Sequence, residues 1–207
     1  NSVPISLPAV LGEQHVYPVL AALALGIAYQ VPIVEMAESL KEMHLTPGRM
    51  RIIEGAEGSV IIDDTYNSSP TALEKALEVF DSVDFSKKKI IALGDMLELG
   101  RYTASEHRAV GQMIAKIKPD FFVTVGWRME LAIEEAIAHG YDEKKTRKFV
   151  KSDEAAEFLT KYLKLGNLFL IKGSQGTRME KIVKMLMKNP EQAKSFLVRQ
   201  DDEWLLK

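Results

Sequence analysis

The sequence predicts an α/β fold: a Rossmann-like, mostly parallel sheet with helices on both faces, preceded by a short helical region. After residue 50, short apolar runs alternate with longer segments whose apolar residues recur at helical spacing. Polar or glycine-containing segments directly follow three of these apolar runs. Strands that alternate with helices in this way are typical of a parallel sheet that is covered on both faces.

The apolar runs predict strands near residues 50–53, 59–62, 89–93, 121–125, 147–150 and 168–171. The helical spacing predicts helices over residues 71–83, 104–117, 128–138, 153–163 and 178–188. Two of the expected helix starts, Thr103–Glu106 and Thr177–Glu180, have the sequence of a capping box, in which a Thr and a Glu satisfy free backbone N–H groups.

The region before the alternating pattern has a different character. Pro4, Pro8 and Gly12 favour an extended chain over residues 1–15. An Ala/Leu-rich helix, expected to be buried, follows at 17–29, and an amphipathic helix follows at 34–43. The sequence Leu45–Met50 then interrupts the pattern, so we divide the chain into residues 1–46, 47–190 and a tail of 191–207. The tail has apolar residues that could dock on the domain: Phe196, Leu197, Trp204, Leu205 and Leu206.

Composition excludes several classes of function. The 207 residues have a net charge of −2 and no basic block, so we expect neither a nucleic-acid partner nor a membrane partner. Cysteine is absent, which excludes disulfides, thiolate metal sites and a cysteine nucleophile, and which fits a cytoplasmic location. The longest apolar stretch, residues 16–29, is too short to span a bilayer. A start at Asn1 rather than at Met suggests a trimmed chain.

Three junctions between a strand and a helix have the residues of a binding site: Asp63–Pro70, Gly94–Gly100 and Lys172–Thr177. In a parallel sheet all three lie along one edge, where ligands of open α/β sheets bind. Their glycines allow close approach of a ligand to the backbone, and helix N-termini attract anions. Lys172 adds a positive charge, while Asp64, Asp95 and Glu98 could hold a cation, orient an amine or bind a ribose.

Each of these features also has a purely structural interpretation. The Asp63–Pro70 and Gly94–Gly100 segments could be helix caps and turns, and Lys172–Ser174 could be a solvated turn. His107 borders an apolar stripe and is more typical of a core or cap residue than of a catalyst. The methionines, Trp127 and Trp204 are interpreted as packing residues. The chain has no G-x-x-x-x-G-K-[ST] loop, no G-x-G-x-x-G fingerprint and no zincin-type His pair, so it lacks a strong phosphate anchor of its own.

In their order along the chain, these motifs resemble the Mur ligase family. The matching residues are Gly48–Met50, Asp63–Pro70, Leu93–Gly100 with His107, and Lys172–Ser174 with Met179-Glu180. The likeness is to the branch that joins D-alanyl-D-alanine to a UDP-N-acetylmuramoyl-tripeptide through an acyl phosphate. It implies that residues 49 to about 190 form the last of three domains, and that residues 1–46 are the C-terminal end of the central ATP-binding domain. It implies ATP and Mg²⁺ as cofactors, with the phosphate loop and most Mg²⁺ ligands outside this chain, so that the fragment alone is inactive.

The resemblance also assigns roles to single residues. It implies nucleotide contacts for Arg49, Asp64, Tyr66 and Asn67, with Arg49 as a phosphate contact that is made when the domains close. It implies substrate contacts for Asp95, Glu98, Lys172, Gly173 and Ser174, and it offers Lys172 and His107 as catalytic candidates. No metal ligand is assigned.

Pro18 departs from the pattern of the family, because it occupies the position of an Asn that contacts adenine. Proline has no side-chain amide, so the usual contact is lost, and Gln14 or His15 could replace it. Three alternatives stay open: a folylpolyglutamate or cyanophycin synthetase-like ligase, a non-catalytic nucleotide-binding or docking module, and a Rossmann-like redox domain. Self-association of the fragment through exposed apolar helix faces is also left open.

Overall fold

The computed structural model describes residues 2–7, 10–43, 45–84 and 87–205, and the chain divides into two compact units, residues 1–46 and 47–207. The first unit is a pair of helices, α1 (Val16–Ala28) and α2 (Ile33–Lys41). Val19 and Ala37 are buried, whereas Leu20 and Leu25 are more than half exposed, at 56% and 62%. The prediction that the first helix is buried is therefore wrong within this chain, because the shorter α2 can cover only one stripe of α1.

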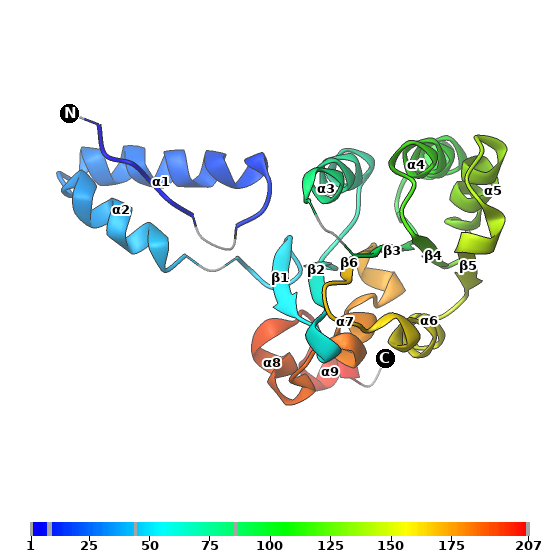
Figure 1. The fold of residues 1–207 in the computed structure, drawn as a ribbon. Helices are drawn as coiled ribbons and strands as arrows, with labels where there is room; N and C mark the ends of the chain where they lie inside the picture. Colours follow the sequence, from blue (N-terminus) through cyan, green and yellow to red (C-terminus); the bar gives the residue numbers. More distant parts are fainter. Residues whose placement is uncertain (1, 8–9, 44, 85–86, 206–207) are drawn as a thin grey trace. The chain divides into compact units, whose positions relative to one another are not determined.

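The second unit is built on one six-stranded sheet with the strand order β1-β2-β6-β3-β4-β5 (Figure 1). β1 is antiparallel to β2, and all other neighbours are parallel. The predicted α/β class and the mostly parallel sheet are confirmed. The strands are β1 (Arg51–Glu54), β2 (Val60–Asp64), β3 (Lys89–Gly94), β4 (Phe121–Val125), β5 (Thr146–Phe149) and β6 (Leu168–Lys172).

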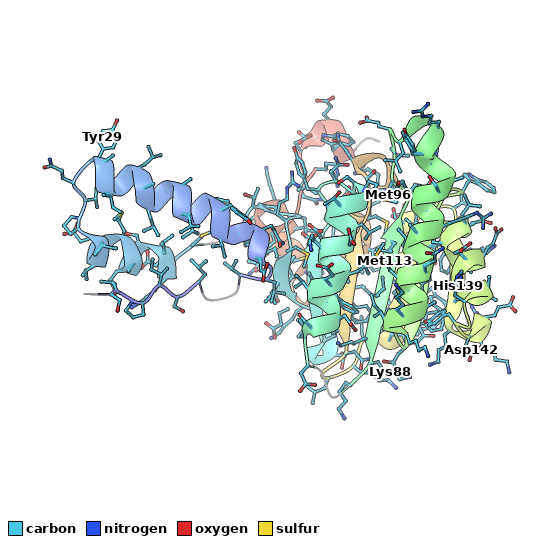
Figure 2. The ribbon with its side chains drawn as sticks, turned by 90° about the horizontal axis from the view of Figure 1, so that it is seen from above. Tyr29, Lys88, Met96, Met113, His139 and Asp142 are labelled. Atoms are coloured by element: carbon cyan, nitrogen blue, oxygen red, sulfur yellow. The ribbon has the colours of Figure 1, made fainter. Side chains whose placement is uncertain are left out.

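Helices cover both faces of the sheet. One face carries α3 (Pro70–Ser82), α4 (Thr103–Ile117) and α5 (Glu130–Ala138), which lie side by side in Figure 2. The other face carries α6 (Ser152–Leu159) and α7 (Glu180–Leu186) (Figure 1). α4 and α5 approach closely at Gly111, where an added Cβ would lie 2.4 Å from the carbonyl oxygen of Ala132. Because both faces are covered, β4 and β6 are buried along their whole length.

Residues 193–205 pack against the rest of the second unit. They form α8 (Ala193–Phe196) and α9 (Asp202–Leu205), which lie near α7 (Figure 1). Leu197 is 4% exposed and belongs to the same apolar cluster as Ile182 of α7. The predicted docking of the tail is thus observed at Leu197, whereas Leu206 lies outside the described residues. Single-turn 3-10 helices complete the fold at Glu13–His15, Ala56–Gly58, Gly100–Tyr102, Glu143–Lys145, Thr160–Tyr162, Gln175–Thr177 and Pro190–Gln192.

Both predicted capping boxes are wrong. Tyr102 is the N-cap of α4, and the hydroxyl of Thr103 donates to the carbonyl oxygen of Gly100. Met179 is the N-cap of α7, and the hydroxyl of Thr177 donates to the carbonyl oxygen of Ser174. In each case the threonine closes the turn before the helix, so its hydroxyl points away from the first helical N–H groups.

None of the helices in the described part of the chain combines the length and the apolar character needed to cross a bilayer.

Candidate functional site

The three predicted junctions come together at one edge of the sheet. β2, β6 and β3 are adjacent and parallel, so the segments that follow them are neighbours. We call these segments, residues 63–70, 94–100 and 172–177, the rim. Lys88 and Met96, labelled in Figure 2, mark the two ends of β3, and the rim lies at the Met96 end.

Ser174 ties the three segments of the rim together. Its backbone N–H donates to the carbonyl oxygen of Asp95 at 3.1 Å, and its hydroxyl donates to the carbonyl oxygen of Ser68 at 3.3 Å. The same hydroxyl oxygen accepts a hydrogen bond from the backbone N–H of Leu97 at 2.9 Å. Ser174 is 3% exposed, so these contacts form the interior of the rim.

Asp64 and Lys172 form a buried ion pair beneath the rim. They are cross-strand partners in the register of β2 and β6, and Lys172 Nζ lies 2.6 Å from Asp64 Oδ2. Lys172 Nζ also donates to the carbonyl oxygen of Asn67 at 3.0 Å, and Asp64 Oδ1 accepts from the backbone N–H of Met50. Their side chains are only 2% (Lys172) and 9% (Asp64) exposed, so each group neutralises the other within the protein.

Asp63 is fully buried, and no cationic side chain of the described residues forms an ion pair with it. Its carboxylate accepts hydrogen bonds from the N–H and hydroxyl of Thr65 and from the N–H of Gly48 at 3.1 Å. Burial is the main cause that raises the pKa of Asp63 to about 6, with a smaller contribution from the neighbouring charge of Asp64. Gly48 has φ +69°, and an added Cβ would lie 2.7 Å from the backbone nitrogen of Tyr66. Residues 48–50 are therefore held against the end of β2.

Asp95 holds the start of α5. One carboxylate oxygen accepts from the backbone N–H of Met129 at 2.8 Å, and the other lies 3.2 Å from Arg128 Nη1. An added Cβ at Gly126, whose φ is +101°, would lie 2.5 Å from the carboxyl carbon of Asp95. The glycine is therefore required for this carboxylate to cap the helix.

His107 holds the Gly94–Gly100 segment against α4. The backbone N–H of Met96 donates to Nε2 at 3.1 Å, so Nδ1 carries the proton and donates to the carbonyl oxygen of Thr103 at 2.6 Å. Burial lowers the pKa of His107, which keeps the ring neutral. Both ring nitrogens are engaged within the chain.

Gly173 permits the close approach of β3 and β6 at the rim. An added Cβ would lie 2.6 Å from Met179 Cγ and 3.0 Å from the Cα of Gly94. Packing between the ends of β3 and β6 thus explains why Gly94 and Gly173 are both glycines.

A second group of predicted residues faces outward. Arg49, Tyr66, Asn67 and Glu98 are all exposed. The guanidinium of Arg49 lies 4.1 Å from the centre of the Tyr66 ring, and no carboxylate of the described residues lies within 4.0 Å of its nitrogens. The Ser68 hydroxyl, which the sequence did not single out, is buried and has no hydrogen-bond partner among the described residues. The four exposed side chains are available to a ligand.

An open cavity of about 550 Å³ lies beside the rim. Trp127 borders it and is 69% exposed, so its interpretation as a packing residue is wrong. The sequence prediction does not include this part of the site, although Gly126-Trp127-Arg128 follows an apolar strand just as the three predicted junctions do. The charged side chains that line the cavity are Asp95, Arg128, Lys151, Asp153, Arg178 and Lys181. Four cations and two carboxylates leave its lining net positive.

No group of three or more His, Asp or Glu side chains in the described part of the chain is arranged to hold a metal ion.

Comparison with known proteins identifies the protein family to which the chain belongs. Residues 48–175 match the family described as Mur ligase, glutamate ligase domain, so the chain belongs to that family. The resemblance predicted from the motifs is confirmed.

Among individual relatives, the chain is 30% identical over 181 residues to the UDP-N-acetylmuramoyl-tripeptide–D-alanyl-D-alanine ligase of Bacillus subtilis, which covers 87% of the chain and 39% of that protein. The Escherichia coli protein of the same name is 27% identical over 193 residues, covering 91% of the chain and 40% of that protein. The chain therefore spans about two fifths of the length of these curated relatives.

Solved structures agree with this assignment. MurF from Acinetobacter baumannii matches with a TM-score of 0.73 and 31% identity, over 83% of this chain and 37% of that one. MurF ligase from Thermotoga maritima in complex with ADP matches with a TM-score of 0.67 and 25% identity, over 87% of this chain and 39% of that one.

Proposed function

We propose that this chain is the C-terminal part of an ATP-dependent ligase that adds D-alanyl-D-alanine to a UDP-N-acetylmuramoyl-tripeptide, a step in building the peptidoglycan precursor. The assembled rim is the observation that carries the proposal, because it brings the separated motifs of the family to one edge of one sheet. The names of the curated relatives, which match over most of the chain, supply the substrates.

The proposed reaction has two steps. The tripeptide carboxylate attacks the γ-phosphorus of ATP, which gives an acyl phosphate and releases ADP. The amine of D-alanyl-D-alanine, once deprotonated, then attacks the acyl carbon, and inorganic phosphate leaves as the peptide bond forms. Both steps depend on positioning the reactants and on stabilising phosphate charge.

Arg49 and the outward-facing residues Tyr66 and Asn67 of the rim are the proposed nucleotide contacts. Arg49 carries an exposed guanidinium with no carboxylate partner among the described residues, and its planar fork suits a phosphate. The Tyr66 ring lies against it, and Asn67 is the next residue along the chain. Asp64 contributes through the shape of this segment, because its carboxylate is already bound to Lys172.

The cavity beside the rim is the proposed site of the dipeptide. Its net positive lining suits the dipeptide carboxylate. The exposed carboxylate of Asp153 in the lining, together with that of Glu98, which adjoins the lining residue Leu97 in the sequence, suits the ammonium end before it loses its proton. Lys172, Gly173, Ser174 and Asp95 hold together the rim segments that border the cavity. We place the Mg²⁺ ligands in another part of the complete protein, and the protein itself in the cytoplasm, where ATP is available.

The complete protein that contains these residues provides the test. We expect ADP release that requires both UDP-N-acetylmuramoyl-tripeptide and D-alanyl-D-alanine, with product formation followed by mass spectrometry. L-Alanyl-L-alanine is the matched control for the dipeptide, and folate with glutamate is the control for the alternative ligase. ADP release with folate and glutamate, and none with the two proposed substrates, would overturn the proposal.

The 207-residue chain alone supplies a second test. We expect weak or undetectable ATP–Mg²⁺ binding and no ligation, because the chain has no phosphate loop. Turnover by these residues alone would contradict the proposal that the phosphate loop lies in another domain of the complete protein.

A further inference from the structure

The segment that follows α8 reaches back to the rim through Arg199. Arg199 is 9% exposed and has φ +56°, a left-handed backbone conformation that residues other than glycine adopt at a cost. Its guanidinium donates to the backbone carbonyl oxygens of Thr65 and, at 3.1 Å, of Tyr66. One side chain from the C-terminal segment thus binds two consecutive carbonyl groups of the rim.

Glu180 neutralises the charge of this buried guanidinium. Its carboxylate is fully buried, and one oxygen accepts from Arg199 Nε at 3.2 Å and Nη2 at 3.1 Å. The other oxygen accepts from Arg178 Nε, and Arg178 Nη1 donates to the carbonyl oxygen of Trp204 at 2.9 Å. Buried charges persist when they are paired and hydrogen-bonded, and here the pairing links Arg199 and the backbone of Trp204 to the start of α7.

The two carbonyl contacts act on the backbone of the rim. The carbonyl of Thr65 is part of the peptide group between Thr65 and Tyr66. The carbonyl of Tyr66 is part of the peptide group between Tyr66 and Asn67. Holding both planes fixes the backbone dihedrals of Tyr66. It therefore sets where the Tyr66 ring and Asn67 stand relative to Arg49, which lies over that ring.

We propose that Arg199 is a positioning residue for nucleotide binding: through the Thr65 and Tyr66 carbonyls it sets the placement of Tyr66 and Asn67 without touching the nucleotide. This inference rests on the proposed function, in which Tyr66 and Asn67 contact ATP. It also makes the C-terminal segment, which the sequence analysis treated as a docked tail, part of the site.

Arg199→Lys is the decisive variant. It keeps a positive charge beside Glu180, but it cannot bridge both carbonyl groups with a rigid fork. The matched control is Arg51→Met, because Arg51 also binds carbonyl groups of the C-terminal region, those of Ser195 and Phe196, but none in the rim.

Two measurements test the role of Arg199. In the 207-residue chain, Arg199→Lys should unfold at the wild-type urea midpoint, while amide hydrogen exchange of residues 66–68 becomes about tenfold faster. In the complete protein it should raise KM for ATP about tenfold and leave kcat within about twofold, and Arg51→Met should change neither quantity.

Wild-type exchange at residues 66–68 in Arg199→Lys, or an equal rise of KM in Arg51→Met, would overturn the inference. If the complete wild-type protein shows no ligation, the proposed function fails, and the exchange measurement still decides whether Arg199 holds the rim. If Arg199→Lys is destabilised, faster exchange at residues 66–68 than in an equally destabilised core variant, Ile182→Val, supports the positioning role, and equal rates overturn it.

Discussion

The inner residues of the rim and the outer residues, which are Arg49 and the rim residues Tyr66 and Asn67, have opposite environments. Asp64, Asp95 and Lys172 are buried, and their charged groups bind other side chains of the protein or its backbone. Arg49 and Asn67 are exposed, although Asn67 lies only three residues from Asp64. The difference shows that a charged residue of a motif can be engaged wholly within the protein. In this molecule the inner charges hold three segments in place, and the outer groups are free to bind.

Breaking the inner pair is expected to have the largest effect. Lys172→Met leaves the carboxylate of Asp64 buried without its cation, and we expect the free energy of unfolding to fall by about 3–5 kcal/mol. Adding Asp64→Asn should recover at least half of that loss, since the amide is neutral and can still accept from Met50 N–H. Urea denaturation of the 207-residue chain, followed by circular dichroism, measures both.

The exposed pair Lys188–Glu54 is the control, because its nitrogen–oxygen distance is also 2.6 Å. Lys188→Met should cost less than about 1 kcal/mol. Equal losses in Lys172→Met and Lys188→Met would show that burial gives the inner pair no special role.

The second effect concerns pH. The pKa of Asp63 is raised from 3.8 to about 6, so the folded protein binds this proton more tightly than the unfolded chain does. The contribution of protonated Asp63 to the free energy of unfolding is fully present below pH 4 and is lost as pH rises through about 6. The free energy of unfolding then falls by an amount on the order of 3 kcal/mol. Asp63→Asn should remove this fall between pH 4 and pH 7, as measured by urea denaturation at several pH values. The exposed Asp84→Asn should keep the wild-type dependence, and a parallel pH dependence in Asp63→Asn would refute the assignment.

The third effect concerns His107. His107→Ala leaves the buried N–H of Met96 without an acceptor, and we expect a loss of about 2 kcal/mol in urea denaturation. Because the ring is neutral and bound at both nitrogens, the pH–rate profile of ligation by the complete protein should keep its shape. The exposed His139→Ala is the stability control. A profile that loses one limb in a well-folded His107→Ala protein would instead identify His107 as a proton carrier.

The outer residues should affect stability least. Arg49→Met and Asn67→Ala remove exposed groups, and we expect each to change the free energy of unfolding by less than about 1 kcal/mol. In the complete protein each should raise KM for ATP about tenfold, with little change in KM for the dipeptide. Lys151→Met, which alters the cavity beside the rim, should show the reverse pattern. Unchanged KM for ATP in both outer variants would remove the distinction between inner and outer residues.

The sequence predicts the elements better than the roles of single residues. Apolar periodicity located every strand of the sheet and the helices that cover it, because one face of each element must be buried. It did not show that β2 extends to Asp64 and β6 to Lys172, which turns two expected loop residues into cross-strand partners. A propensity pattern contains no information on which strands are neighbours.

Long-range contacts explain the remaining differences. Glu180 fits a capping box locally, yet its carboxylate binds Arg178 and, from 19 residues further on, Arg199. Trp127 follows an apolar strand, yet it borders an open cavity. The groups around Glu180 and Trp127 include residues that are distant in the sequence: Arg199 binds Glu180, and Lys151 and Lys181 line the same cavity as Trp127.

A crystal structure of the complete protein with a non-hydrolysable ATP analogue would test the central claim most directly. We predict that the Arg49 guanidinium and the Asn67 amide lie within hydrogen-bond distance of the nucleotide, while Lys172 Nζ stays on Asp64. A structure in which Lys172 has left Asp64 to bind the nucleotide or the tripeptide, with Arg49 and Asn67 still facing solvent, would contradict the account.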